Sequence, residues 1–125
     1  MLILAVALGG ALGAVLRYAV VTGAASAIGR TFPFGTLAVN IVGSFLIGML
    51  FVWFQARGPH HEILRASLIV GLLGGFTTFS AFSLETLNLF VGGHPGRAAL
   101  NVVLNVSLCL AAAAAGVKLS KSLFA

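Results

Sequence analysis

The sequence predicts an all-α membrane protein with four transmembrane helices in a single domain over residues 1–125. Of its 125 residues 60% are hydrophobic and only 7% are charged, and the mean hydropathy is +1.15. A soluble domain of this size keeps far more charged groups at its surface. The apolar residues also form four continuous runs, whereas transmembrane strands alternate apolar and polar positions.

The four helices are predicted at about residues 2–21, 35–55, 63–91 and 97–117. Glycine, proline and charged residues separate them, in a loop through Gly29, Arg30 and Pro33, a polar stretch over 57–62 and a glycine-rich turn over 92–96. The first run could also be a signal peptide. No Lys or Arg precedes it, however, and Arg17 follows its apolar stretch, which favours a membrane span.

The third run is too long for a simple span. A continuous helix over 63–91 would be roughly 43 Å long, against a hydrocarbon core of about 30 Å. Its middle reads GGFTTFS over 74–80, and glycines followed by hydroxyl residues are poor helix formers. We therefore predict a mid-membrane break near 75–80, a feature that usually marks an ion or substrate site. The alternative is a straight, tilted helix whose small residues serve packing.

Polar side chains recur at four-residue spacing in the second and fourth runs. The two rows are Thr36, Asn40 and Ser44, and Asn101, Asn105 and Cys109. Residues four apart share one helix face, and polar groups inside a span need partners or line a path. Neither row contains an acid, so both offer N–H and O–H donors suited to an anion. The other interpretation is interhelical hydrogen bonding without a path.

Phe79, Phe82 and Glu85 follow the predicted break at three-residue steps. The edge of an aromatic ring is electropositive, so two ring edges facing a path would attract an anion and hold it weakly. Packing against lipid or core would explain the same spacing. Glu85 is the acid within the spans, and it suits a protonatable gate or a partner for Arg17.

The remaining charges argue against enzymes and nucleic-acid binding. The formal net charge is +5, but without basic clusters this is membrane-flanking and anion-friendly charge rather than a nucleic-acid footprint. No carboxylate pair, Cys/His cluster or nucleotide-binding loop is present, so the chain is predicted not to be an enzyme. Two competing classes are a small multidrug transporter, which needs an acid in the first span that this chain lacks, and an assembly subunit without transport activity.

Small residues and charge both bear on assembly. The pairs Gly9 and Gly13, Gly10 and Ala14, Ser44 and Gly48, and Gly71 and Gly75 predict close helix contacts. Four basic residues, Arg57, Arg65, Lys118 and Lys121, are expected on the side of the termini, and Arg30 and Arg97 on the other, with Arg17 near one membrane edge. Such a slight bias allows insertion in both orientations, and hence an antiparallel dimer.

Three stretches carry a family resemblance: GGALGAVLRY over 9–18, GTLAVN over 35–40 with Gly43-Ser44-Phe45, and GGFTTFSAFS over 74–83 with Glu85. Through these the sequence resembles the Fluc/CrcB fluoride channels along all four segments. The resemblance implies an antiparallel, dual-topology homodimer with two pores, each lined by both subunits. It also implies passive fluoride export across the bacterial inner membrane, which protects the cell from fluoride toxicity.

The resemblance also assigns residues. It implies that the ring edges of Phe79 and Phe82 contact fluoride beside the Ser80 hydroxyl, with Asn40 in the pore and Thr36 and Glu85 in a vestibule. It implies a structural sodium ion at the dimer axis, held by the backbone carbonyls of Gly74 and Thr77. Asn101 and Asn105 are added as pore-lining candidates from their spacing, and Arg17 as a vestibule residue. The sequence departs from the family at Ala81, where a threonine is common, and at Asn101, Asn105 and Cys109, where some members carry Tyr and Ser.

Overall fold

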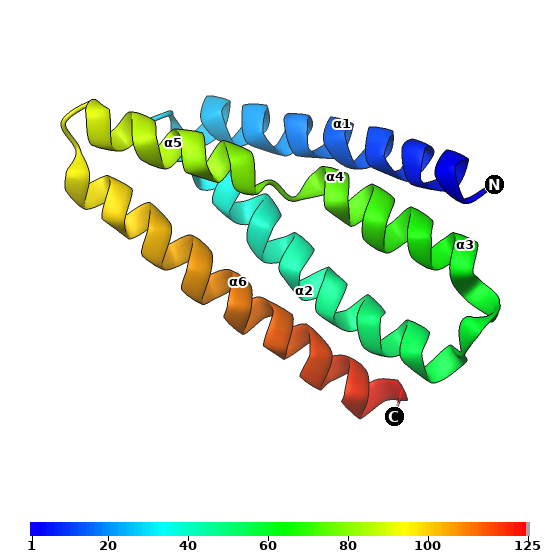
Figure 1. The fold of residues 1–125 in the computed structure, drawn as a ribbon. Helices are drawn as coiled ribbons and strands as arrows, with labels where there is room; N and C mark the ends of the chain where they lie inside the picture. The colour runs from blue at the N-terminus through cyan, green and yellow to red at the C-terminus, as the bar shows by residue number, and fades with distance from the viewer. Residues whose placement is uncertain (125) are drawn as a thin grey trace.

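The computed structural model describes residues 1–124, so that Ala125, the last residue of the predicted domain, lies outside the described part. Four long helical passes make up the described chain (Figure 1). They are α1 (Leu2–Ile28), α2 (Phe34–Arg57), a composite third pass (Pro59–Val91) and α6 (Pro95–Phe124). Each is long and apolar enough to cross a membrane. The predicted all-helical, four-span architecture is confirmed, and the chain is a multi-pass membrane protein.

The helices are longer than predicted. α1 continues seven residues beyond 21, to Ile28, through an alanine-rich stretch that favours helix. The hydroxyl groups of Thr22 and Ser26 donate to carbonyls one turn earlier, which satisfies them within the helix. Gly29 ends α1 with a φ of 96°, a backbone conformation that suits glycine. α6 likewise extends past 117 to Phe124, because Lys118 and Lys121 are good helix formers.

Helices α2 and α6 pack closely along their length (Figure 1). A Cβ atom added at Gly48 would collide with the carbonyl oxygen of Ala113, and one at Gly116 with that of Phe45. Such close backbone approach is how helices associate in lipid, where packing replaces the hydrophobic effect. The predicted role of Gly48 in a close contact is therefore confirmed, although Gly116 was not predicted.

Helix α1 packs in the same way against the third pass. Cβ atoms at Gly9 and Gly13 would collide with the backbone of Ser67 and Leu72. Conversely, a Cβ at Gly75 would lie 2.5 Å from the carbonyl oxygen of Gly10. The predicted close contacts at these small-residue pairs are confirmed, and the structure adds that the first and third runs contact each other through them.

The third pass is built from five short elements. They are η1 (Pro59–His61), α3 (Glu62–Arg65), η2 (Ala66–Leu73), α4 (Gly74–Phe76) and α5 (Phe79–Val91). η2 is a π-helix, a widened turn that hydrophobic patterning does not reveal. Between α4 and α5, Thr77 and Thr78 have extended backbone, with ψ values of 157° and 116°. The depth of this interruption in a membrane stays a prediction.

Both termini lie at one end of the bundle, together with the connection between α2 and α3 (Figure 1). The α1–α2 and α5–α6 connections lie at the opposite end. Arg57 and Lys118 therefore belong to the end with the termini, and Arg30 and Arg97 to the other. The Arg17 guanidinium donates to the Thr77 carbonyl at 3.4 Å, and its predicted place near one membrane edge stays a prediction.

Candidate functional site

A groove of about 450 Å³ lies beside the interruption of the third pass. It is bounded by α2, by the segment from η2 to α5, and by α6. The residues that matter here are Asn40, Thr77, Thr78, Phe79, Phe82 and Asn105. Four of these six, Asn40, Phe79, Phe82 and Asn105, were singled out by their spacing in the sequence. Thr77 entered through the family resemblance, as a backbone carbonyl, and Thr78 had no predicted role of its own.

Asn40 holds the interrupted backbone. Its Oδ1 accepts from the Thr78 amide N–H at 2.8 Å, and its Nδ2 donates to the Thr78 carbonyl at 3.1 Å. The side-chain amide thus pairs with both backbone groups of the residue at which helical hydrogen bonding stops. On the other side of Thr78, its own hydroxyl accepts from the Ala81 N–H at 3.1 Å and caps α5.

A chain of amides continues from Asn40 into α6. The second Asn40 N–H donates to Asn105 Oδ1 at 3.1 Å, and Asn105 Nδ2 donates to Asn101 Oδ1 at 2.9 Å. Asn101 Nδ2 then donates to the Thr86 hydroxyl of α5 at 2.9 Å. Asn101 has no exposed surface and Asn105 is 6% exposed. In the single chain Asn105 borders the groove, whereas Asn101 does not and contacts it through the Asn105 side chain.

Phe79 and Phe82 lie together at the start of α5. Their ring centroids are 5.3 Å apart and the rings are tilted by 58°. Phe82 is buried within the chain, whereas Phe79 is 77% exposed on the open side of the groove. The helical spacing noted in the sequence therefore brings the rings into contact but leaves one of them facing outward.

Thr36 and Glu85 form a second polar pair, on the other side of α5. The Thr36 hydroxyl donates to Glu85 Oε1 at 2.6 Å, while Oε2 is buried with no hydrogen-bond partner among residues 1–124. Arg17, Thr36, Ser80 and Glu85 all line one hollow of about 580 Å³, which we call the inner hollow. Thr36 is the partner of Glu85 in the structure, and the suggested Arg17–Glu85 ion pair is absent from the described residues.

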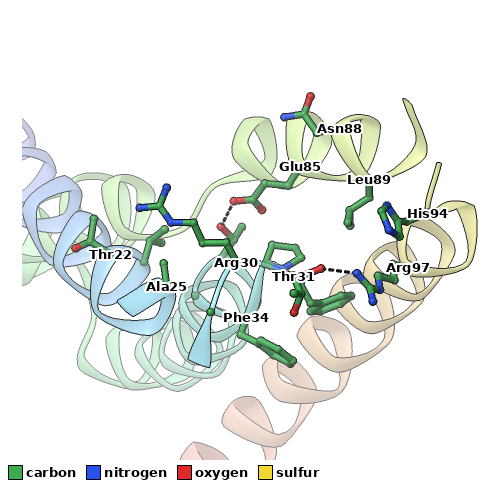
Figure 2. A pocket seen from close by; sticks show the side chains of 16 residues that line it. Thr22, Ala25, Arg30, Thr31, Phe34, Glu85, Asn88, Leu89, His94 and Arg97 are labelled. Atoms are coloured by element: carbon green, nitrogen blue, oxygen red, sulfur yellow. Dashed lines mark hydrogen bonds between the residues drawn. The ribbon is translucent and has the colours of Figure 1, made fainter. Parts of the chain in front are cut away.

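A larger cavity of about 790 Å³ opens at the end of the bundle away from the termini (Figure 2). Thr36 and Glu85 line both this cavity and the inner hollow, and Arg30, His94 and Arg97 surround the cavity. Arg97 donates to the Thr31 carbonyl at 3.5 Å, which connects α6 to the α1–α2 loop (Figure 2). We call this the outer cavity.

Sequence patterns located most of these residues but not their contacts. Asn40, Ser44 and the two phenylalanines line the groove, whereas Thr36 and Glu85 line the inner hollow. Thr86 was missed because a threonine in an apolar helix ordinarily bonds its own backbone, as Thr86 also does to the Phe82 carbonyl. Arg97 and His94 were missed as cavity residues because loop charges carry no periodicity that tells which loops meet.

Comparison with known proteins decides the family. The model of the family described as "CrcB-like protein, Camphor Resistance (CrcB)" matches residues 4–117. The chain belongs to the CrcB family. This confirms the resemblance inferred from the three sequence stretches.

Relatives in the CrcB family carry an informative name. A protein of Magnetococcus marinus is 51% identical over 111 residues, which cover 89% of this chain and 90% of that protein. One of a Shewanella species is 53% identical over 108 residues, covering 86% of each, and one of Coxiella burnetii is 46% identical over 122 residues, covering 97% and 98%. All three are named "Fluoride-specific ion channel FluC". CrcB membership also confirms that the chain is not an enzyme.

Proposed function

We propose that this chain forms a fluoride-selective ion channel. The supporting observation is that relatives named as fluoride-specific channels align with nearly the whole chain at about half identity. The family match over residues 4–117 spans the interruption at Thr77 and Thr78 and every residue of the groove and inner hollow. In membrane proteins, exposed backbone at such an interruption is a frequent element of an ion site.

The chemistry of the groove suits a small, strongly hydrated anion. Fluoride has to exchange its water shell for close N–H, O–H and polarised C–H groups. Ser80 carries an O–H group and the edges of Phe79 and Phe82 are electropositive. The N–H groups of Asn40 and Asn105 are engaged within the single chain, so in this proposal their amide dipoles border the path and their N–H groups would have to turn from these partners to reach the ion. Within the described chain, no Lys or Arg lines the groove, so an ion is not trapped there by a full positive charge.

The proposed path has an entrance and a constriction. The outer cavity admits the ion, and Thr36 and Glu85, which also line the inner hollow, lead to Ser80 there. Phe79, Phe82 and the Asn40 and Asn105 amides border the next part of the path. Arg17 stands beside it, between the inner hollow and the Thr77 carbonyl.

A second copy of the chain completes the path in this proposal. The groove is open on one side, and Phe79 is 77% exposed there, beside further apolar residues that include Ile47 and Leu110. An antiparallel partner with its own groove would cover these groups and make two equivalent pores. The weak charge difference between the two ends permits such dual topology. Reporter domains fused to the C-terminus should be found on both membrane faces, and reporters on one face alone would contradict the antiparallel dimer.

A structural sodium ion fits this dimer as a shared site. Because α4 ends at Phe76 and the Thr78 N–H is taken by Asn40, the Gly74 carbonyl loses its normal helical donor. Gly74 and Thr77 border the same open groove, and freed carbonyls are the oxygen ligands that suit Na⁺. The Thr77 carbonyl also accepts from Arg17 at 3.4 Å. One chain supplies only these two carbonyls, which is half of the proposed site. Two chains would together supply four carbonyls and a fixed positive charge near the path.

The physiological role proposed is passive fluoride export across the bacterial inner membrane, which relieves fluoride toxicity. A channel needs no energy source for this, because any fluoride accumulated in the cytoplasm leaves down its electrochemical gradient.

Flux from liposomes tests the function. Purified protein is reconstituted into vesicles loaded with fluoride or chloride, a voltage is set with a potassium ionophore, and ion-selective electrodes follow release. Rapid fluoride release without chloride release is expected. Proton-coupled uptake of a cation would instead indicate a transporter, and no flux of any kind would indicate an assembly subunit; either result would overturn the proposal.

A further inference from the structure

We infer that Thr86 and Asn101 are positioning residues: through the buried amide chain they fix Asn40 against the Thr77–Thr78 interruption, and with it the start of α5. Neither residue borders the groove. The inference rests on the proposed function, because the groove at the start of α5 is the path in that proposal.

The amide chain is anchored at both ends by backbone groups. At one end, Asn40 accepts from the Thr78 N–H and donates to the Thr78 carbonyl. At the other, the Thr86 hydroxyl donates to the Phe82 carbonyl at 2.7 Å. The amide chain passes from α2 through α6 to α5. It therefore links α2 and α6, which bound the groove, to the helix that carries both phenylalanines.

The hydrogen bonds of the amide chain have only one self-consistent direction. A flipped Asn40 would set its NH₂ against the Thr78 N–H and its oxygen against the Thr78 carbonyl. With Asn40 fixed, its remaining N–H requires Asn105 to present oxygen, and the Asn105 NH₂ then donates to the backbone carbonyl of Asn101 at 3.0 Å and to Asn101 Oδ1 at 2.9 Å. An Asn101 NH₂ in place of Oδ1 would face the Asn105 NH₂, donor against donor. The NH₂ of Asn101 is then left facing α5, where it needs an acceptor.

Thr86 provides that acceptor. Its hydroxyl hydrogen is used by the Phe82 carbonyl, so its lone pairs are available to Asn101 Nδ2 at 2.9 Å. Asn101 has no exposed surface, and water therefore cannot replace a lost partner. Removal of the Thr86 hydroxyl leaves one buried donor of Asn101 without a partner. The Asn101 side chain then loses its contact with α5, and the Asn105 amide that pairs with Asn40 loses a firmly placed acceptor.

The matched pair Thr86→Val and Thr86→Ser tests the inference. Valine keeps the shape of threonine but has no hydroxyl, whereas serine keeps the hydroxyl. Ser107→Ala is the control, since Ser107 is exposed and, among residues 1–124, its hydroxyl bonds only the Val103 carbonyl of its own helix. Each variant is purified, checked for monodispersity and thermal unfolding, and assayed for fluoride and chloride release from liposomes at equal amounts of folded protein.

Thr86→Val should lower fluoride release by roughly tenfold or more, in keeping with an unsatisfied buried donor, and should lower the ratio of fluoride to chloride flux. Thr86→Ser should restore both, and Ser107→Ala should match the wild type. Equal flux and selectivity in the Val and Ser variants would overturn the inference, even if Thr86→Val were less stable.

If Thr86→Val does not fold, Asn101→Asp is the second test. Aspartate conserves the shape of asparagine but replaces the N–H donor to Thr86 with an oxygen, and unchanged flux in that variant would overturn the inference. Absence of fluoride release from the wild type would instead reject the proposed function.

Discussion

At the scale of single residues, the hydrogen-bonding groups of the site are almost all engaged by a specific partner. Both N–H groups of Asn40 and its oxygen are engaged, by Thr78 and Asn105. Phe82 is packed inside the chain, whereas Phe79 presents most of its ring outward. Substitution of Asn40 therefore disturbs hydrogen bonds inside the chain, whereas substitution of Phe79 changes a mostly exposed ring. Both residues border the proposed path.

We predict that Phe79→Ile and Asn40→Asp each abolish fluoride flux without preventing assembly. Isoleucine removes the electropositive ring edge. Aspartate places a carboxylate oxygen opposite the Thr78 carbonyl and repels an anion. Liposome release measures flux, and size-exclusion chromatography measures assembly. Phe90→Ile is the control, because Phe90 is an exposed ring on the same helix and lies outside the groove; normal throughput in both test variants would remove these residues from the path.

Sequence spacing predicted which polar residues share a helix face, but not what each face contacts. Asn40 and Asn105 were found because a four-residue period places them on faces that must be satisfied in lipid. Their partners could not be derived, since a carbonyl such as that of Thr78 looks the same in every sequence. For the same reason the Gly74 and Thr77 carbonyls entered only through family resemblance.

At the scale of elements, close backbone contact decides how the helices pair. Gly116 of α6 lies against the Phe45 carbonyl of α2, and one turn further along the buried Ser120 hydroxyl donates to the Met49 carbonyl at 2.9 Å. Van der Waals contact and an interhelical hydrogen bond are the interactions that associate helices in lipid. The close packing of α2 and α6 thus brings Asn40 and Asn105 within hydrogen-bonding distance.

Gly116→Ala should destabilise this pair. The new Cβ would collide with a backbone carbonyl that cannot rotate away, so we expect a cost of about 1–3 kcal/mol, typical of overpacking. Thermal unfolding in detergent should show a lower Tm. In Gly23→Ala, by contrast, the new Cβ meets nothing within 4 Å, and the gain in helix propensity predicts an unchanged or higher Tm. A Gly116→Ala protein as stable as Gly23→Ala would show that the contact does not limit packing.

Element boundaries were less predictable than element number. Hydropathy located four spans, but the ends of α1 and α6 were placed too early because small or basic residues outside an apolar run still form helix. The π-helix at Ala66–Leu73 had no signal in the sequence. A π-helix is a change of hydrogen-bond register, in a segment that packs against α1, whereas patterning reports only which residues are apolar.

At the scale of the whole molecule, charge is distributed between the two ends of the bundle. Four basic side chains belong to the end with the termini, whereas Arg30, His94 and Arg97 surround the outer cavity at the other. Arg97 is held by the Thr31 carbonyl. Positive groups around a concave entrance raise the local concentration of anions and the rate at which they arrive. In the proposed path, the outer cavity would therefore act on the supply of ions rather than on selection between them.

Arg30→Gln should lower fluoride flux in a way that depends on ionic strength. At about 0.01 M salt the screening length is about 30 Å, so loss of one charge at the entrance should reduce the rate severalfold; at 0.15 M it is about 8 Å, and the difference from wild type should shrink. Lys121→Gln removes the same charge at the opposite end of the chain and serves as the control. The fluoride-to-chloride ratio should stay constant in both, because the groove is untouched. An effect of Arg30→Gln that is equally large at high salt, or a changed ratio, would mean that Arg30 acts by direct contact with the path rather than by steering ions toward it.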